Sequence, residues 1–248
     1  MDWSLTNKKL CVFVPNYQRG KYLHLTIGFL YEKNKDVDFC CVIGNDTHDP
    51  YVDSLCQKYP NCYSFTLDRI AVSRNGAFVR NYFVKRCQSE WILQKDPECL
   101  LIGKENWLED FNHKSTNDFY RADQVCMVPL EQSKAIFEGE KPNLILENVD
   151  HNKHFHIHHC LVAPTKVLQD IGGYDEDFLY YGPEDLDMWL RLKSYGLEQH
   201  MLEVTSLHLY HERDTNFLNQ NHRDMEVIMA NKNPNTFIRN QGREWGQG

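Results

Sequence analysis

The alternation of buried strands and helices in the first 68 residues most constrains the fold. Leu10 to Val14 is a short apolar run ended by Pro15, and similar runs occur at 37–46 and 61–68. Apolar residues recur at helical spacing between the first two runs, and 49–59 predicts a shorter helix. Strand, helix, strand, helix, strand at this cadence predicts an α/β fold with a mixed, mostly parallel sheet flanked by helices.

In such a sheet, ligands bind in the loops that follow the carboxyl ends of the strands. The corresponding loops here are PNYQRG, GNDTHD and, after the strand EWILQ, QKDPE. The last loop holds Asp96 and Glu98, whose carboxylates are costly beside a buried strand unless a cation meets them. Oxygen ligands at a strand end suit Mg²⁺ or Mn²⁺ that holds substrate phosphates, although the same pattern is common in solvated turns.

Further along, Ser73 is a good N-cap for a helix that contains Phe78 and Phe83, and Arg80 and Lys85 are expected on its solvated face. The segment 103–142 is polar and weakly periodic, and we expect it to form helices and loops that cover the ligand-binding loops.

The clearest helix follows Pro183, which suits the first helical position. Asp187 and Arg191 form an i,i+4 pair, and Leu186, Trp189 and Leu190 are expected to form its apolar stripe. Glu184 and Asp185 occupy the first turn, where carboxylates are routine, but where one can also serve as a general base. The segment 202–213, LEVTSLHLYHER, predicts a last strand that ends in histidines.

Composition narrows the class of protein. The 248 residues are 42% hydrophobic, and no apolar stretch is long enough to cross a membrane. The formal charge of −8 makes long nucleic acid a less favoured ligand. The nine cysteines are odd in number and include no C-x-x-C, and we see no signal peptide, so we expect reduced thiols and a cytoplasmic location.

Four separated pieces resemble, in the same order, the GT-A fold inverting glycosyltransferases that use nucleotide-diphosphate sugars. The pieces are VFVPNYQRGKYL, VIGNDTHD, SRNGAFVRNYFVKRCQSEWILQKDPE and IGGYDEDFLYYGPEDLDMWLRL. The first three are similar to the family-2 type of these enzymes, and the last resembles an acceptor loop and base-bearing helix of galactosyltransferase type. The resemblance implies a Rossmann-like GT-A domain over 1–215 with a partly irregular C-terminal extension over 216–248.

The resemblance also implies roles for individual residues. A nucleotide-sugar site would be lined by Pro15, Tyr17, Arg19, Asn45, Asp46, Arg74, Asn75 and Asp96. A metal ion would be held by Asp96, Glu98 and His208, with His211 as a competing ligand, while Asp185 would be the catalytic base and Glu184 would hold the acceptor. The chain departs from the family pattern at Asn45, where paired acids are frequent, and at Glu98, where Asp is usual.

These roles imply a metal-dependent hexosyltransferase that uses Mn²⁺ or Mg²⁺ and a nucleotide-diphosphate sugar, with UDP-sugars the commonest donors in related enzymes. The acceptor stays open among a glycan, a lipid-linked sugar, a protein and a modified nucleic acid. Two alternatives are a nucleotidyltransferase and a non-catalytic module that binds nucleotide sugars or glycans. His154, His156 and His158 alternate as on one strand face, which fits a separate zinc site, sugar contacts or a half-exposed surface.

Overall fold

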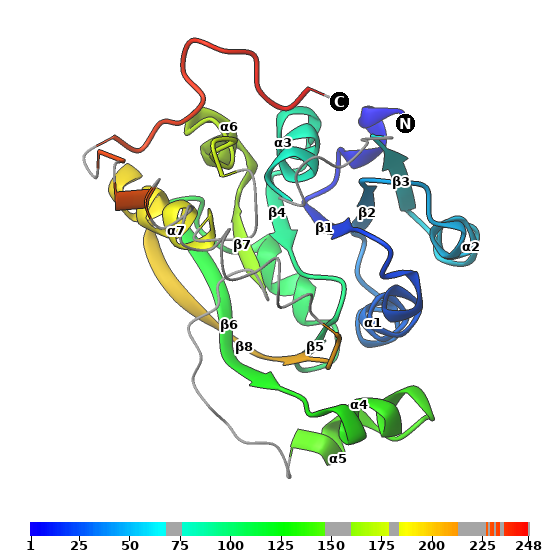
Figure 1. Ribbon diagram of the computed structural model, residues 1–248. Helices are drawn as coiled ribbons and strands as arrows, with labels where there is room; N and C mark the ends of the chain where they lie inside the picture. The colour runs from blue at the N-terminus through cyan, green and yellow to red at the C-terminus, as the bar shows by residue number, and fades with distance from the viewer. Residues whose placement is uncertain are drawn as a thin grey trace.

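The computed structural model describes residues 1–67, 76–146, 160–178, 184–212, 227, 229–230, 232–233 and 236–247. Within these residues, eight strands form one sheet in the order β3-β2-β1-β4-β7-β6-β8-β5, flanked by helices (Figure 1). Four neighbouring strand pairs are parallel and three are antiparallel. The expected α/β class with a mixed, mostly parallel sheet is therefore confirmed.

The strands are β1 (Leu10–Asn16), β2 (Cys40–Asn45), β3 (Cys62–Thr66), β4 (Trp91–Gln94), β5 (Cys99–Ile102), β6 (Asp118–Met127), β7 (Leu161–Pro164) and β8 (Glu198–His208). The α-helices are α1 (Gly20–Lys33), α2 (Pro50–Lys58), α3 (Ala77–Arg86), α4 (Leu130–Phe137), α5 (Pro142–Leu146), α6 (Thr165–Asp170) and α7 (Glu184–Tyr195). Short 3₁₀ helices are η1 (Trp3–Thr6) and η2 (Trp107–Asn112). No described helix has the length and apolar character that a membrane crossing requires.

Side chains alternate along β1 and so build a core on each face of the sheet. Val12 and Val14 join a cluster with residues of α1, α2 and η2. Cys11 and Phe13 point the other way, into a cluster with residues of α3, α6 and α7. The two layers of helices are visible on opposite sides of the sheet in Figure 1.

The first strand extends further than the proline suggests. β1 continues through Pro15 to Asn16, so the expectation that Pro15 ends the strand is wrong. Phe13 is the last residue of β1 in register with β4, and Pro15 points its nitrogen to that same side two residues later. A missing N–H costs little there, because no strand residue of β4 pairs with that position.

The polar segment 103–142 contains a ten-residue strand, β6, in addition to the expected helices and loops. This strand lies between β7 and β8, and its register shifts between Ala122 and Gln124. The irregular register and the mixture of buried and exposed side chains explain why a period of two is not visible in its sequence.

Helix α7 turns a different face to the core from the one expected. Leu186 and Leu190 are 41% and 40% exposed, so the predicted apolar stripe is wrong for both residues. Asp187 and Arg191 are buried instead and form the expected i,i+4 ion pair, with 2.6 Å between Nε and Oδ2. The inward face of α7 therefore carries this charged pair together with Met188 and Leu192.

Candidate active site

The ends of β1 and β2 are joined by a network of buried polar side chains. Asn16 donates from Nδ2 to Oδ1 of Asn45 (2.7 Å) and to Oδ2 of Asp49 (3.1 Å). Asp49 also accepts from the backbone N–H groups of Gly20 (3.0 Å) and Tyr51 (3.1 Å), at the starts of α1 and α2. The two loops after these strands are thus fixed to each other, with Asn45 between them.

The other residues expected at the nucleotide lie around this network. Pro15 is buried within β1, and Tyr17 is half-buried directly after it. Asp46 is buried and its N–H donates to the backbone oxygen of Asn16 (3.1 Å). Arg74 and Asn75 lie outside the described residues, as do His154, His156 and His158.

A buried lysine, which the sequence did not mark as important, forms hydrogen bonds inside the turn after β4. Lys95 is fully buried, and its Nζ donates to the backbone oxygen of Asp96 (2.9 Å) and to Oγ1 of Thr26 (3.3 Å). Burial lowers the pKa of Lys95, although nearby acidic groups act in the opposite direction. Thr26 donates to the backbone oxygen of Pro97 (2.8 Å), so both carbonyls inside the turn are satisfied.

Glu98, His208 and His211 form a group with metal-binding spacing. Their potential ligand atoms all lie within 4.8 Å of one another. Pairing of β5 with β8 sets Cys99 opposite His208, and the N–H of Leu209 donates to the backbone oxygen of Glu98 (3.1 Å), which brings the histidines beside the acidic turn. Two imidazoles and one carboxylate can together bind a divalent transition metal, so these residues fit such an ion.

Arg19 contacts two members of this group. Its Nε lies 2.5 Å from Oε1 of Glu98, and Nη2 lies 3.2 Å from Nδ1 of His211. Arg19 therefore stands between the loop after β1 and the candidate metal ligands, where a guanidinium can also face a diphosphate.

Asp96 lies next to this group but contacts a different partner. Among the described residues, the metal-spaced groups do not include Asp96, whose Oδ1 instead lies 3.4 Å from Nη2 of Arg80. Nη1 of the same Arg80 lies 3.8 Å from Oε1 of Glu184, at the start of α7. One guanidinium thus joins two acidic segments that are far apart in the sequence.

The prediction that Arg80 is solvated is wrong, because its side chain is only 7% exposed. Its guanidinium also lies over the ring of Tyr174, 5.4 Å from the centroid. Burial lowers the pKa of Arg80, but Asp96, Tyr174, Glu184 and Asp185 together raise it above its ordinary value, so the group stays charged. No local signal marks Arg80, because these partners come from distant segments.

Asp185 lies in the same electrostatic environment. Burial raises the pKa of its carboxyl well above the ordinary value, Arg80 lowers it, and Asp96 raises it. A carboxyl group whose pKa is raised above its ordinary value holds a proton more readily, which suits a group that must accept one. The structure therefore brings Asp96, Glu184 and Asp185 around Arg80, beside the group of Glu98, His208 and His211.

The chain is similar in sequence to one known family over part of its length. A protein-family model described as the N-terminal domain of galactosyltransferase matches residues 160–213, which span β7, α6, α7 and β8. No curated protein matches the sequence significantly.

Solved structures share the fold of this chain at low sequence identity. A mannosyltransferase from Pyrobaculum calidifontis, in complex with GDP-Man and Mn²⁺, has a TM-score of 0.61 and 13% identity over 93% of this chain and 67% of its own. S. aureus TarS 1-349 in complex with UDP-GlcNAc has a TM-score of 0.55 and 17% identity, over 82% of this chain and 60% of its own. The catalytic domain of Drosophila β1,4-galactosyltransferase 7, in complex with xylobiose, has a TM-score of 0.54 and 16% identity, over 84% of this chain and 75% of its own. The resemblance to GT-A glycosyltransferases is confirmed at the level of the fold.

Proposed function

We propose that this chain is an inverting glycosyltransferase that moves a sugar from a nucleotide-diphosphate donor to an acceptor hydroxyl, assisted by a divalent metal. The observation that carries the proposal is the single Arg80 guanidinium that joins the turn of Asp96 to the start of α7. The family match over 160–213 and the shared GT-A fold support the same class of reaction.

The donor nucleotide is proposed to bind at the ends of β1 and β2. Pro15, Tyr17, Asn45 and Asp46 line these loops, and the network of Asn16 and Asp49 keeps the loops in place. Arg19 would face the diphosphate together with Arg74 and Asn75. Structural neighbours bind GDP-Man and UDP-GlcNAc, and a UDP-sugar is our first choice of donor.

We propose that Glu98, His208 and His211 hold Mn²⁺ or Mg²⁺. Asp96 would contact either this ion or the ribose of the donor. A bound ion would neutralise the negative charge that develops on the departing diphosphate. Because the potential ligand atoms of both histidines and Glu98 lie within 4.8 Å of one another, we propose that both histidines bind the ion together and do not compete for it.

Asp185 is proposed to take the proton from the acceptor hydroxyl as that oxygen attacks the anomeric carbon. Glu184, buried beside Arg80, would accept a hydrogen bond from another acceptor hydroxyl. Attack from the face opposite the diphosphate inverts the anomeric centre. The nine cysteines all carry free thiols and eight are buried, which supports the proposed cytoplasmic location.

A donor screen tests this proposal. Release of nucleoside diphosphate from UDP-galactose, UDP-GlcNAc and GDP-mannose is followed with Mn²⁺ and with EDTA, using wild type and Asp185→Asn. We expect turnover of at least one donor that needs Mn²⁺ and is lost in Asp185→Asn. Donor binding without any turnover would indicate a non-catalytic module, and release of inorganic pyrophosphate from a nucleoside triphosphate and a sugar phosphate would indicate a nucleotidyltransferase.

A further inference from the structure

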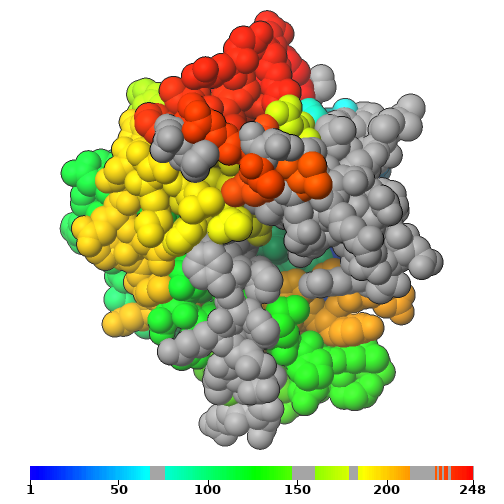
Figure 2. Space-filling view, turned by 60° about the vertical axis from the view of Figure 1, so that its left-hand side comes forward, coloured from blue at the N-terminus to red at the C-terminus, as the bar shows by residue number. Residues whose placement is uncertain are grey.

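The end of the chain packs on the segment that leads to the candidate base. Residues 236–247 lie at the surface next to α3 and α6 (Figures 1 and 2). The N–H of Arg239 donates to the backbone oxygen of Ile171 (3.0 Å), and a Cβ on Gly172 would lie 2.2 Å from the backbone oxygen of Arg239. This contact tolerates no side chain at 172, so the two backbones are closely apposed.

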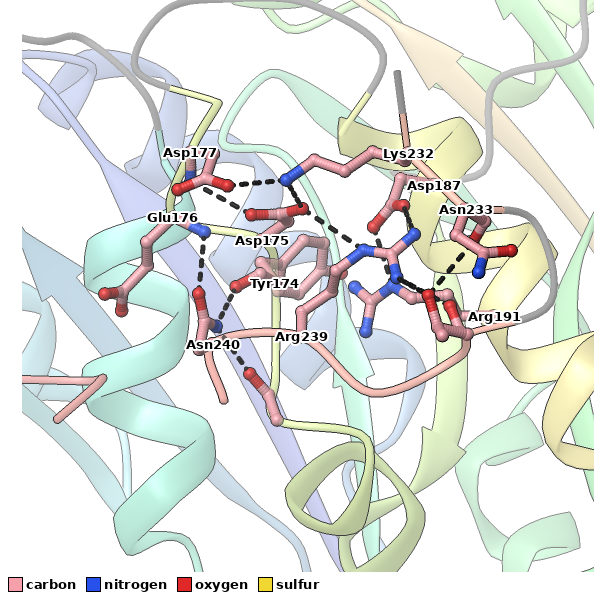
Figure 3. A network of polar contacts seen from close by, with 12 residues as sticks. Tyr174, Asp175, Glu176, Asp177, Asp187, Arg191, Lys232, Asn233, Arg239 and Asn240 are labelled. Carbon is pink, nitrogen blue, oxygen red and sulfur yellow. Dashed lines mark hydrogen bonds and ion pairs between the residues drawn. The ribbon is translucent and has the colours of Figure 1, made fainter. Parts of the chain in front are cut away.

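Asn240 holds the same segment by its backbone. Its Nδ2 donates to the carbonyls of Gly172 (2.7 Å) and Tyr174 (2.8 Å), and its Oδ1 accepts from the N–H of Glu176 (3.2 Å), as Figure 3 shows in part. Asn240 has a φ of 58°, a left-handed conformation that Asn tolerates better than most residues. Tyr174, held in this way, is the residue whose ring lies under Arg80.

Arg239 connects this segment to α7 by charge. Its Nε lies 3.2 Å from Oδ2 of Asp175, and its Nη2 lies 2.8 Å from Oδ1 of Asp187. Both carboxylates are 1% exposed, and Arg239 is 9% exposed. Figure 3 shows the Arg239 side chain beside the carboxylates of Asp175 and Asp187, with Arg191 also close to Asp187. A buried guanidinium with two buried carboxylates has few alternative positions.

Asp187 is two residues after Asp185, in the first turn of α7. A shift of Asp187 would therefore move Asp185 and Glu184 with it. We propose that Arg239, in the C-terminal segment, is a positioning residue that fixes the first turn of α7 against 171–178. This inference rests on the proposed function for its kinetic consequence, but its structural consequence can be measured without any substrate.

Arg243 offers a matched control in the same segment. It pairs with Asp177 (2.8 Å), but its side chain is 40% exposed and that of Asp177 is 47% exposed. The distance from its Nη2 to Oδ1 of Asp175 is longer, at 3.7 Å. Arg243 also donates to Oδ1 of Asn240. Arg243→Met therefore removes an arginine that contacts 171–178, but it leaves the link between Arg239 and Asp187 in α7 closed.

The first test is hydrogen exchange of the full chain, followed by mass spectrometry. In Arg239→Met, we expect amides of 171–178 and 184–192 to exchange about tenfold faster, while those of 10–33 keep their wild-type rates. Arg243→Met should leave 184–192 and 10–33 unchanged, because it contacts 171–178 but not α7. Unchanged exchange in Arg239→Met, or an equal increase in all segments, would overturn the proposal, the latter because it indicates general destabilisation.

The second test uses diphosphate release from the donor that wild type turns over. In Arg239→Met, we expect kcat to fall about tenfold or more while KM for the donor stays within about twofold, because Arg239 contacts the segment 171–175 and α7. Arg239→Lys should recover part of kcat, since one ammonium can still reach one carboxylate. Full kcat in Arg239→Met with an inactive Asp185→Asn would refute this inference alone, whereas an active Asp185→Asn would refute the proposed base instead.

Discussion

Arg80 and Asp96 face each other between α3 and the turn after β4, with 3.4 Å between Nη2 and Oδ1. Because the other terminal nitrogen of Arg80 lies near Glu184, this pair connects the donor half of the sheet with the helix that carries Asp185. Arg80 therefore helps to set the placement of the Asp96 turn relative to Asp185.

Arg80→Met should lower both stability and activity. Removing the cation leaves buried acidic groups without a counter-charge, which costs about 3–5 kcal/mol in the free energy of unfolding. Arg80 also lowers the pKa of Asp185, so its loss should move the acidic limb of the rate profile to higher pH. Urea unfolding and the pH dependence of diphosphate release check both effects. Lys35→Met, which removes an exposed lysine elsewhere in the chain, is the control and should leave both unchanged.

Asp185→Asn should separate activity from stability. Loss of a general base lowers kcat about 10²- to 10⁴-fold. Burial raises the pKa of Asp185, so the ionised carboxylate is less favourable in the folded than in the unfolded protein. The folded protein therefore loses stability as pH rises through the raised pKa. We expect the melting temperature of Asp185→Asn to exceed that of wild type at neutral pH, and the difference to vanish near pH 4. A lower melting temperature than wild type at neutral pH would contradict this account, and the exposed Asp53→Asn serves as the control.

His211→Ala should weaken Mn²⁺ binding in the absence of any donor. Loss of an outer-shell partner typically lowers metal affinity about 10- to 100-fold, so loss of a ligand should lower it at least as much, and we expect Glu98→Gln to act in the same direction. Because imidazole must be neutral to bind a metal, wild-type affinity should also fall as the pH is lowered. Isothermal titration calorimetry measures both trends. His113→Ala, at an exposed position, is the comparison, and equal affinities in the two histidine variants would exclude His211 as a ligand.

Asp49→Ala should weaken donor binding and leave the proton transfer proposed for Asp185 unchanged. Its carboxylate accepts from Asn16, from the start of α1 and from the start of α2, so we expect a loss of about 2 kcal/mol in unfolding free energy. The donor KM should rise, while the pH dependence of kcat should stay that of wild type. A donor KM equal to that of Asp53→Ala would show that the network does not shape the nucleotide loops.

The sequence predicts those parts of the protein whose signals are local. Buried runs give β1, β2 and β3, and helical spacing gives α1. The pair of Asp187 with Arg191 is predicted because both residues lie on one helix, four positions apart. The positions of Glu98 and His208 at element ends are equally readable, since each directly borders a strand.

Contacts between distant segments escape this reasoning. Arg80 has the sequence pattern of a surface residue, and only its partners at 96 and 184 explain its burial. Arg239 lies in a polar tail with no periodicity, yet it is fixed by two buried carboxylates. The strand β6 has too irregular a register to show alternation. In each case the missing information is which distant group supplies the counter-charge or the neighbouring strand.

The most direct test of the account is a crystal structure with Mn²⁺ and UDP, with diffraction measured at the manganese absorption edge. We predict an anomalous peak bound by Glu98, His208 and His211, with the diphosphate on the ion and Asp185 facing it across the sugar position. A peak at other residues, or a diphosphate bound away from the turn of Asp96 and the start of α7, would contradict the account.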